Sequence, residues 1–186
     1  MSRSVLTLLL ASSLLPVACR SLPTATAPNV TLRTHPAVVD TGVDGGLTTL
    51  ELTNHTDDAI LAVSIGDGSE LGWRTPTIHW RVWNRDGELV EPEDIPGRCG
   101  NQNGLRWSEL AELAPGESVH FETWSTSPPY GLPPGEYTAV IEYDHNPNQS
   151  WGGLVMGHEE GALERLREST AFRCTTERFS LIVRER

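Results

Sequence analysis

Two segments of alternating character, each preceded by Pro-Gly-Glu, lie within residues 113–143. Apolar and polar side chains alternate over 119–124 and again over 137–143, a period of two that is typical of strands burying one face. Proline followed by glycine favours a type II turn, because proline presets φ and glycine accepts the positive φ of the third position. The pattern therefore predicts an all-β domain whose chain turns at Pro115-Gly116 and again at Pro134-Gly135.

Further segments carry strand patterns, and one carries a helical pattern. Segment 29–40 is interpreted as an edge-like strand broken at Pro36, and 59–65 is an apolar run suited to a strand buried on both faces. A narrow apolar stripe with glutamates at its start predicts a helix over 158–169. The other strands are expected at 47–53, at 78–83, at 88–90 after an Asp86-Gly87 turn, and at 178–183. Together these segments predict an antiparallel β-sandwich with one short helical insert before the last strand.

The first eighteen residues have the layout of a secretory signal peptide. An apolar run over 5–15 is too short for a membrane span, which needs about 20 residues. The small residue before Cys19 resembles the lipobox of bacterial lipoproteins, although Pro16 occupies a position where leucine is typical. The sequence thus predicts a signal peptide over 1–18, lipidation at Cys19 and a flexible tether over 19–29; the alternative is an ordinary cleaved signal peptide.

Residues 30–186 are long enough for one domain with an ordinary core. Within them only Cys99 and Cys174 remain, and two leftover cysteines in an oxidising compartment most simply pair. A disulfide between them closes a loop of about 75 residues and contributes roughly 4 kcal/mol in the chain-entropy estimate. A metal or reactive thiol site is the rival hypothesis, but no further ligands flank either cysteine.

The charge balance is acidic, with 14 Lys+Arg against 25 Asp+Glu, and every one of these cations is arginine. Nucleic-acid binding needs a basic footprint, so the sequence argues against a nucleic-acid partner. No other class of partner follows from the net charge.

Several short motifs recur along the predicted strands: Trp107-Ser108, LAPGES at 113–118, Phe121, Trp124, PGEYT at 134–138, and the earlier segments 52–54 and 82–87. These motifs resemble the intracellular proteinase inhibitor (BsuPI-type) domain, and the strand pattern as a whole resembles immunoglobulin-like sandwiches. The motifs cover roughly residues 47–143. The resemblance implies an immunoglobulin-like fold. It also implies protease inhibition as one possible activity, although no reactive loop can be matched residue by residue.

No catalytic constellation is visible. The chain has no GxSxG elbow around any serine, and its histidines lack HxH or HExxH spacing. His145, Met156 and His158 could gather a soft metal, and the alternating oxygens of Asp144, Asn146 and Asn148 are reminiscent of a calcium loop with its glycine and distal glutamate misplaced. Ordinary surface residues explain both patterns better, so we expect no enzyme activity, no cofactor and no metal.

We therefore expect a non-enzymatic exported lipoprotein whose domain binds another envelope or extracellular protein or serves an envelope structural role. Its expected location is the bacterial cell envelope with a lipid anchor in the membrane; the alternative is a soluble secreted or periplasmic protein. A protease inhibitor and a small metal-binding module are the alternative functions. Exposed tryptophans, among them Trp83, could serve an interface or stack on sugars, although packing on the sandwich explains them more simply.

Overall fold

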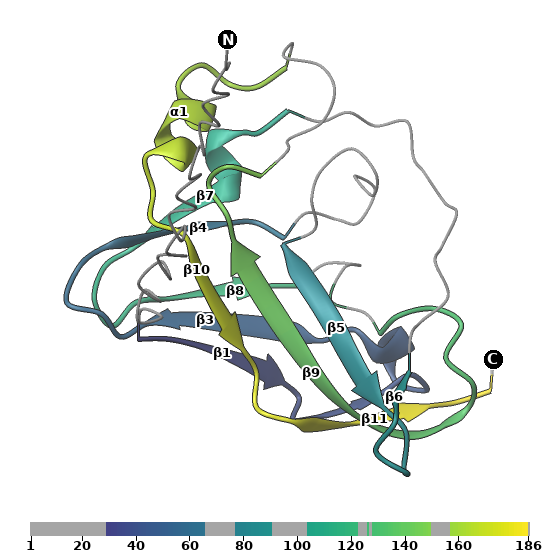
Figure 1. The fold of residues 1–186 in the computed structure, drawn as a ribbon. Helices are drawn as coiled ribbons and strands as arrows, with labels where there is room; N and C mark the ends of the chain where they lie inside the picture. Colours follow the sequence, from purple (N-terminus) through teal and green to yellow (C-terminus); the bar gives the residue numbers. More distant parts are fainter. Residues whose placement is uncertain are drawn as a thin grey trace, which may run out of the picture.

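The computed structural model describes residues 29–65, 77–90, 104–122, 126, 128–149 and 157–185. Within these residues the chain forms mostly β-strands in several sheets, with one short α-helix (Figure 1). The predicted all-β class is confirmed, and so is a short helix before the last strands.

One sheet has three antiparallel strands. Its order is β1 (Val30–His35), β3 (Thr49–Asn54) and β8 (Ser118–Phe121). Leu32 of β1 lies opposite Leu52 of β3. Both side chains point inward and are buried, as the alternation of the sequence predicts. Strand β8 ends at Phe121, three residues before the end of the predicted alternating segment.

A second sheet is organised around β9 (Gly135–His145), the longest strand of the described chain. Its inward side chains include Ala139, Ile141 and Tyr143, each fully buried. The neighbouring strands are β5 (Ile78–Trp83), β6 (Leu89–Val90), β10 (Phe172–Thr175), β11 (Phe179–Val183) and β2 (Val38–Asp40). Strand β5 has its predicted bounds, and the predicted turn before β6 is confirmed by the positive φ of Gly87.

The predicted break at Pro36 is confirmed, because the chain changes sheets there. Strand β1 pairs with β3, whereas β2 pairs with β11 in the second sheet, and a cis His35–Pro36 bond lies between them. The β2–β11 pair is parallel, so the prediction of a wholly antiparallel arrangement is wrong. Proline cannot donate to a ladder, and this position therefore suits a crossing between sheets.

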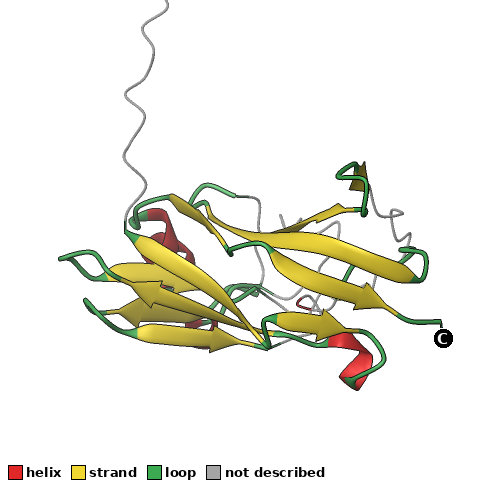
Figure 2. Cartoon of the chain, turned by 90° about the horizontal axis from the view of Figure 1, so that it is seen from below, coloured by secondary structure: helices red, strands yellow, loops and turns green. Residues whose placement is uncertain are grey.

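The two sheets lie in two layers with the main core between them (Figure 2). Leu50 and Leu52 from the first sheet meet Ile141, Tyr143 and Leu181 from the second in one cluster of buried side chains. Burial of such side chains is the dominant stabilising contribution, at roughly 1.5–3 kcal/mol each.

A smaller unit, which we call the cap, lies at one end of these layers. It consists of β4 (Ile60–Val63), β7 (Leu110–Leu113), the 3-10 turn η2 (Trp107–Glu109) and α1 (Ala162–Arg167). The strands β4 and β7 pair with each other, and α1 packs on them through a separate buried cluster: Leu61, Val63, Leu105, Ala162 and Leu166. A second 3-10 turn, η1 (Asp44–Gly46), follows β2.

The helix is shorter than the predicted span of 158–169. Instead of coiling, the preceding residues bind the 105–107 segment: His158 Nδ1 accepts from the Leu105 amide at 2.9 Å and the Glu159 amide donates to the Leu105 carbonyl. Gly161 then adopts a φ of 79° just before the helix begins. Hydrogen bonding to residues 105–107, which lead into β7, thus prevails over helix propensity.

Other local predictions also need correction. Gly116 has the positive φ expected after Pro115, but Gly135 does not, because it is already the first residue of β9. Strand β9 extends beyond the predicted alternating segment of 137–143 and includes Asp144 and His145. The strands β7 and β10 were not predicted at all.

Candidate functional site

A groove lies between β1 of the first sheet and segment 175–179 of the second. It encloses roughly 500 Å3, within the range typical of ligand sites. Its lining consists of β1, Ala37, Thr175 and residues 177–179. Buried Leu32 and Phe179 supply apolar walls, and exposed Arg33 and Glu177 lie at its rim.

An interruption in the second sheet explains why the groove is open. Strands β10 and β11 pair with successive parts of β9, at residues 142–145 and 135–139. Between them the Thr176 amide still donates to the Ile141 carbonyl, and residues 177–178 leave the ladder. Strand β2 covers the far side of β11, while β10 has no strand partner besides β9 in the described chain. Because β1 belongs to the other sheet, no ladder joins the two walls, and nothing described fills the space between them.

The free edge of β1 faces this opening. In an antiparallel ladder, the backbone groups of alternate residues point to opposite sides. The Asn29 carbonyl accepts from the His55 amide at 2.8 Å, and this bond determines which residues of β1 direct their backbone groups toward β3. The amides and carbonyls of Thr31, Arg33 and His35 therefore face β3. The amides and carbonyls of Val30, Leu32 and Thr34 face away from β3, and no hydrogen bond to them is found within the described part of the chain.

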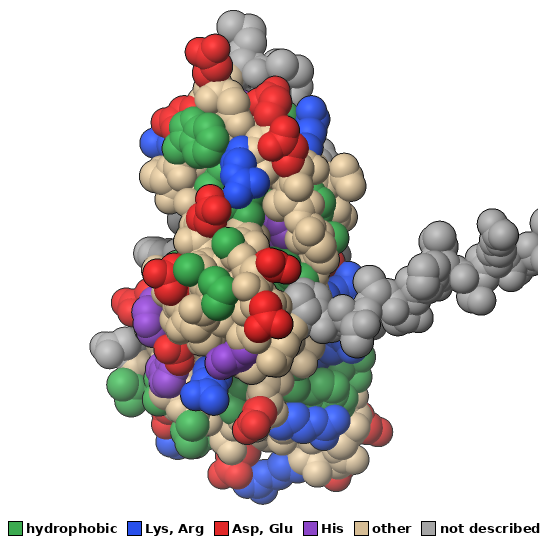
Figure 3. Space-filling view, turned by 90° about the vertical axis from the view of Figure 1, so that its left-hand side faces the viewer, with side chains coloured by type: hydrophobic (Ala, Val, Ile, Leu, Met, Phe, Trp, Pro, Cys, Tyr) green, Lys and Arg blue, Asp and Glu red, His purple; other side chains and the backbone are tan. Residues whose placement is uncertain are grey.

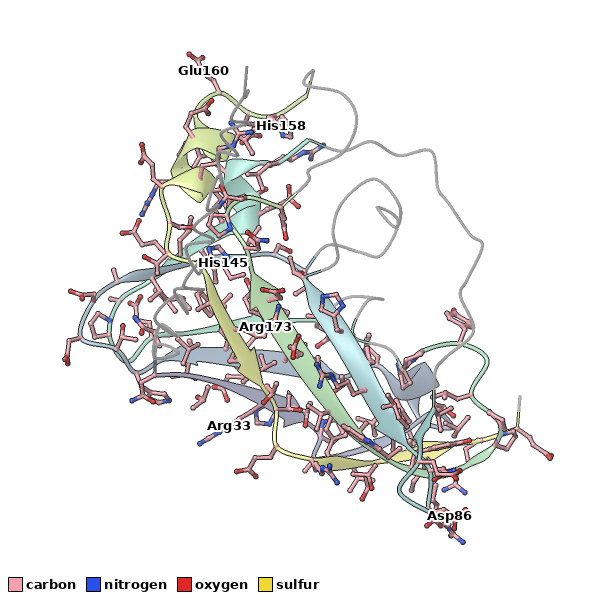
Figure 4. All side chains as sticks on the ribbon, viewed as in Figure 1. Arg33, Asp86, His145, His158, Glu160 and Arg173 are labelled. Carbon is pink, nitrogen blue, oxygen red and sulfur yellow. The ribbon has the colours of Figure 1, made fainter. Side chains whose placement is uncertain are left out.

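Charged side chains at the rim are unevenly paired. The register places Arg33 opposite Glu51, yet the Glu51 carboxylate binds His35 Nε2 at 3.1 Å and lies 3.9 Å from His120 Nε2. No described carboxylate forms an ion pair with Arg33, which extends from β1 into solvent (Figure 4). On the opposite wall, the Arg178 guanidinium lies 4.6 Å from the centre of the Trp83 ring.

The predicted disulfide cannot be placed, because Cys99 lies outside the described residues. Cys174 has a free thiol and lies in β10. Its side chain packs on the main core, and burial, aided by the charge of Glu142, raises the pKa of the thiol to about 12. The pairing stays a prediction, as does lipidation of Cys19, which also lies outside the described residues.

The groups weighed as metal ligands do not converge. Met156 lies outside the described residues, and His158 binds the Leu105 amide. Asp144 pairs with Arg173 at 2.6 Å, and Asn146 accepts the Asn148 amide. No group of three or more histidine, cysteine, aspartate or glutamate side chains among the described residues is arranged to hold a metal ion.

His145 is buried at the end of β9, next to the cap (Figure 4). Its Nε2 lies 2.8 Å from Ser169 Oγ, which donates to the Leu166 carbonyl at 2.6 Å, so the imidazole donates to the serine. Nδ1 is buried and has no hydrogen-bond partner. Burial lowers the pKa of His145 to about 4, although the charge of Asp144 acts in the opposite direction.

The Ser169–His145 pair lacks the features of a nucleophile and its base. The serine proton is engaged by a backbone carbonyl, no carboxylate orients Nδ1, and the ring is stacked on Phe172 at 5.0 Å. The contact instead ties the end of α1 to β9. Sequence reasoning could not find this pair, since 24 residues separate its members.

Sequence reasoning also missed the groove as a site. Its one visible signal was the edge-like first strand that breaks at Pro36. The described residues include no helix with the length and apolar character that a membrane span requires. Comparison of the chain with protein-family models, curated proteins and solved structures found no match.

Proposed function

We propose that this protein is an exported lipoprotein with an immunoglobulin-like domain that binds another protein. The observation that carries the proposal is the groove beside β1, which combines apolar walls, unpaired backbone groups and unpaired Arg33. Such a combination suits a protein segment better than a small polar molecule, because strand edges recognise extended backbone.

The strand order supports an immunoglobulin-like arrangement. In that fold, strands A, B and E share one sheet, and C, F and G share the other. Here β1, β3 and β8 stand in the order A-B-E, while β11, β9 and β5 stand in the order G-F-C, followed by β6 at the place of an added C′ strand. Strand β2 and the β4–β7 pair are additions to this plan.

A lipid anchor at Cys19 would attach the domain through the short tether that leads into β1. Labelling with radioactive palmitate tests this part of the proposal. The wild-type chain and a Cys174→Ala variant should incorporate the label, whereas Cys19→Ala should not. Incorporation that is unchanged in Cys19→Ala would disprove the anchor.

Site-specific photo-cross-linking in the native envelope tests binding. A photoreactive residue replaces Glu177 at the rim of the groove in one variant and Asp86 at the tip of the β5–β6 turn in another, at a distant place on the molecule (Figure 4). We expect a discrete adduct of higher mass from position 177 and none from position 86. Equal labelling from both positions, or none from either, would contradict a binding role for the groove.

Enzyme activity is the competing class of function. Purified protein assayed against ester, peptide and glycoside substrates should show no turnover above buffer. Turnover that a single substitution abolishes would replace the binding proposal with a catalytic one.

A further inference from the structure

The outer edge of β1 has the properties of a template for an added strand. Val30, Leu32 and Thr34 direct their amides and carbonyls toward the groove, and no described group pairs with them. Unpaired edges of this kind readily accept another strand, because each added residue satisfies backbone groups that otherwise depend on water. Strand β1 contains no proline, so its whole six-residue length can pair.

The groove determines where the side chains of an added strand would lie. Alternate side chains of such a strand share a face with Leu32, whose side chain is buried, and therefore enter the space bounded by Phe179. The intervening side chains share the outer face with Arg33. The occupant must therefore be apolar at every second position.

The outer face adds a requirement of charge. A residue directly opposite Arg33 would belong to a non-hydrogen-bonded pair, in which side chains approach closely and opposite charges stabilise pairing. Since Glu51 binds His35, the Arg33 guanidinium is available to a carboxylate of the occupant. The occupant is thus acidic at the position that faces Arg33.

Neither the chain's own tether nor a second copy of β1 meets this requirement. Residues 19–29 contain no acidic residue, and Pro23 and Pro28 lack the amide that a ladder needs. A second β1 would present Thr31, Arg33 or His35 on the outer face, and none of these is acidic. A different protein must supply the segment.

We infer that β1 binds an extended segment of another protein by strand addition, with apolar side chains in the groove and a carboxylate on Arg33. This inference rests on the proposed binding function and specifies its partner by chemistry. On the face shown in Figure 3, acidic and basic side chains intermingle, so recognition depends on the individual position of Arg33 rather than on a broad charged field.

The test uses the exported, processed chain labelled with nitrogen-15 and a capped seven-residue peptide that alternates valine and glutamate. Titration should shift the amide signals of β1 and protect the amides of Val30, Leu32 and Thr34 from hydrogen exchange. A peptide of the same sequence with N-methylated valines, which cannot donate, should bind at least about ten-fold more weakly. An alternating valine–lysine peptide should also bind more weakly, by about five-fold or more.

Charge reversal at the protein provides the matched variant. Because Arg33 is exposed and has no described partner, Arg33→Glu should leave the fold unchanged, but the thermal midpoint should fall slightly, since the new carboxylate lies opposite Glu51. We expect this substitution to lower the affinity for the valine–glutamate peptide by about five-fold and to raise the affinity for the valine–lysine peptide. Arg85→Glu, at an exposed position on the β5–β6 turn, should leave both affinities unchanged.

Each contrary result overturns a defined part of the inference. Binding that is insensitive to N-methylation excludes strand addition, and binding that is insensitive to Arg33→Glu excludes the carboxylate contact; both leave the wider binding function intact. Dimers that form through β1 at micromolar concentration would replace the foreign segment with a second copy. Absence of peptide binding, together with a position-177 adduct in the envelope, would overturn strand addition alone, whereas absence of both would overturn the proposed function too.

Discussion

The main core and the cap cluster both depend on β9 but differ in size and in the way they are held. The main core gathers residues from both sheets, whereas a separate cap cluster consists of Leu61, Val63, Leu105, Ala162 and Leu166. The cap strands also contribute Ala62 and Leu113 to the main core. Polar side chains, which we call joints, connect the cap to the large unit as well, mainly at the end of β9.

Two of these joints lie two residues apart on the same face of β9. The Tyr143 hydroxyl donates to the Val63 carbonyl and accepts from the Val63 amide, both at 2.8 Å, so a buried polar group is well satisfied. His145 binds Ser169, but its other ring nitrogen has no partner. A third joint is Asn54, whose amide donates to the Leu113 carbonyl at 2.9 Å. The comparison teaches that, beyond the apolar contacts of Ala62 and Leu113, the cap is attached by polar contacts of unequal quality, and its separate cluster should open before the main core does.

Truncation of one buried side chain in each cluster should give the largest difference in global stability. Ile141→Ala should lower the free energy of unfolding of the whole molecule by about 3–4 kcal/mol, because Ile141 is fully buried between the sheets. Leu166→Ala removes a similar side chain but should chiefly accelerate hydrogen exchange in 105–113 and 162–169. Urea unfolding combined with exchange mass spectrometry measures both effects. If Leu166→Ala lowers global stability as much as Ile141→Ala does, the cap is not a separable unit.

Acid should loosen the His145 joint. The pKa of His145 is about 4 in the folded protein and about 6.5 when unfolded, so the unfolded chain binds more protons between these values. The contribution to stability is therefore complete above about pH 6.5 and is lost as the pH falls toward 4, by about 3 kcal/mol in total. Urea unfolding at a series of pH values measures this slope.

The variant His145→Gln should lose much of that slope, because glutamine does not titrate. His79→Gln, on the exposed face of β5, should retain it. A slope that is the same in wild type and in His145→Gln would show that other groups cause the acid sensitivity.

Removal of the Tyr143 hydroxyl should have a smaller effect. Tyr143→Phe leaves the buried amide and carbonyl of Val63 without this partner, which should destabilise the protein by about 1–3 kcal/mol. Exchange of the Val63 amide should accelerate in parallel. Tyr137→Phe is the control, since its hydroxyl donates only to the Pro133 carbonyl in an exposed place; a similar loss in both variants would argue against the special role of Tyr143.

The sequence predicted local structure well wherever neighbouring residues determine it. The alternation of 78–83 predicted β5 with its correct bounds, and proline at 36 predicted the break between β1 and β2. The helix was overestimated because hydrogen bonds from Leu105 and to its carbonyl hold His158 and Glu159, and those partners lie more than fifty residues away. Strand β10 was missed because it ends beside Thr176, whose hydroxyl accepts from the Ile141 amide, and the sequence shows no glycine or proline there.

The groove depends on relations that no local pattern contains. The groove lies between β1 and 175–179, which belong to different sheets or their connection, and β2, just after β1, pairs in parallel with β11, about 140 residues away in sequence. The availability of Arg33 likewise depends on Glu51 binding His35, although the register places Glu51 opposite Arg33. Sequence reasoning therefore predicted an edge strand but not what its edge faces.

The smallest effect is expected at Trp80, which tests how strictly the main core satisfies its polar groups. The Trp80 ring meets Phe179 edge-on, with centroids 5.8 Å apart, but its buried Nε1 has no hydrogen-bond partner. Trp80→Phe loses apolar contact and also removes an unsatisfied donor, so the two effects offset each other and stability should change by less than about 1 kcal/mol. Trp80→Ala, which removes the whole ring, should cost about 3 kcal/mol or more. If Trp80→Phe lowers stability as much as Trp80→Ala does, the unpaired indole N–H does not destabilise the folded protein. The main core would then be as sensitive to loss of a polar group as the contacts that hold the cap.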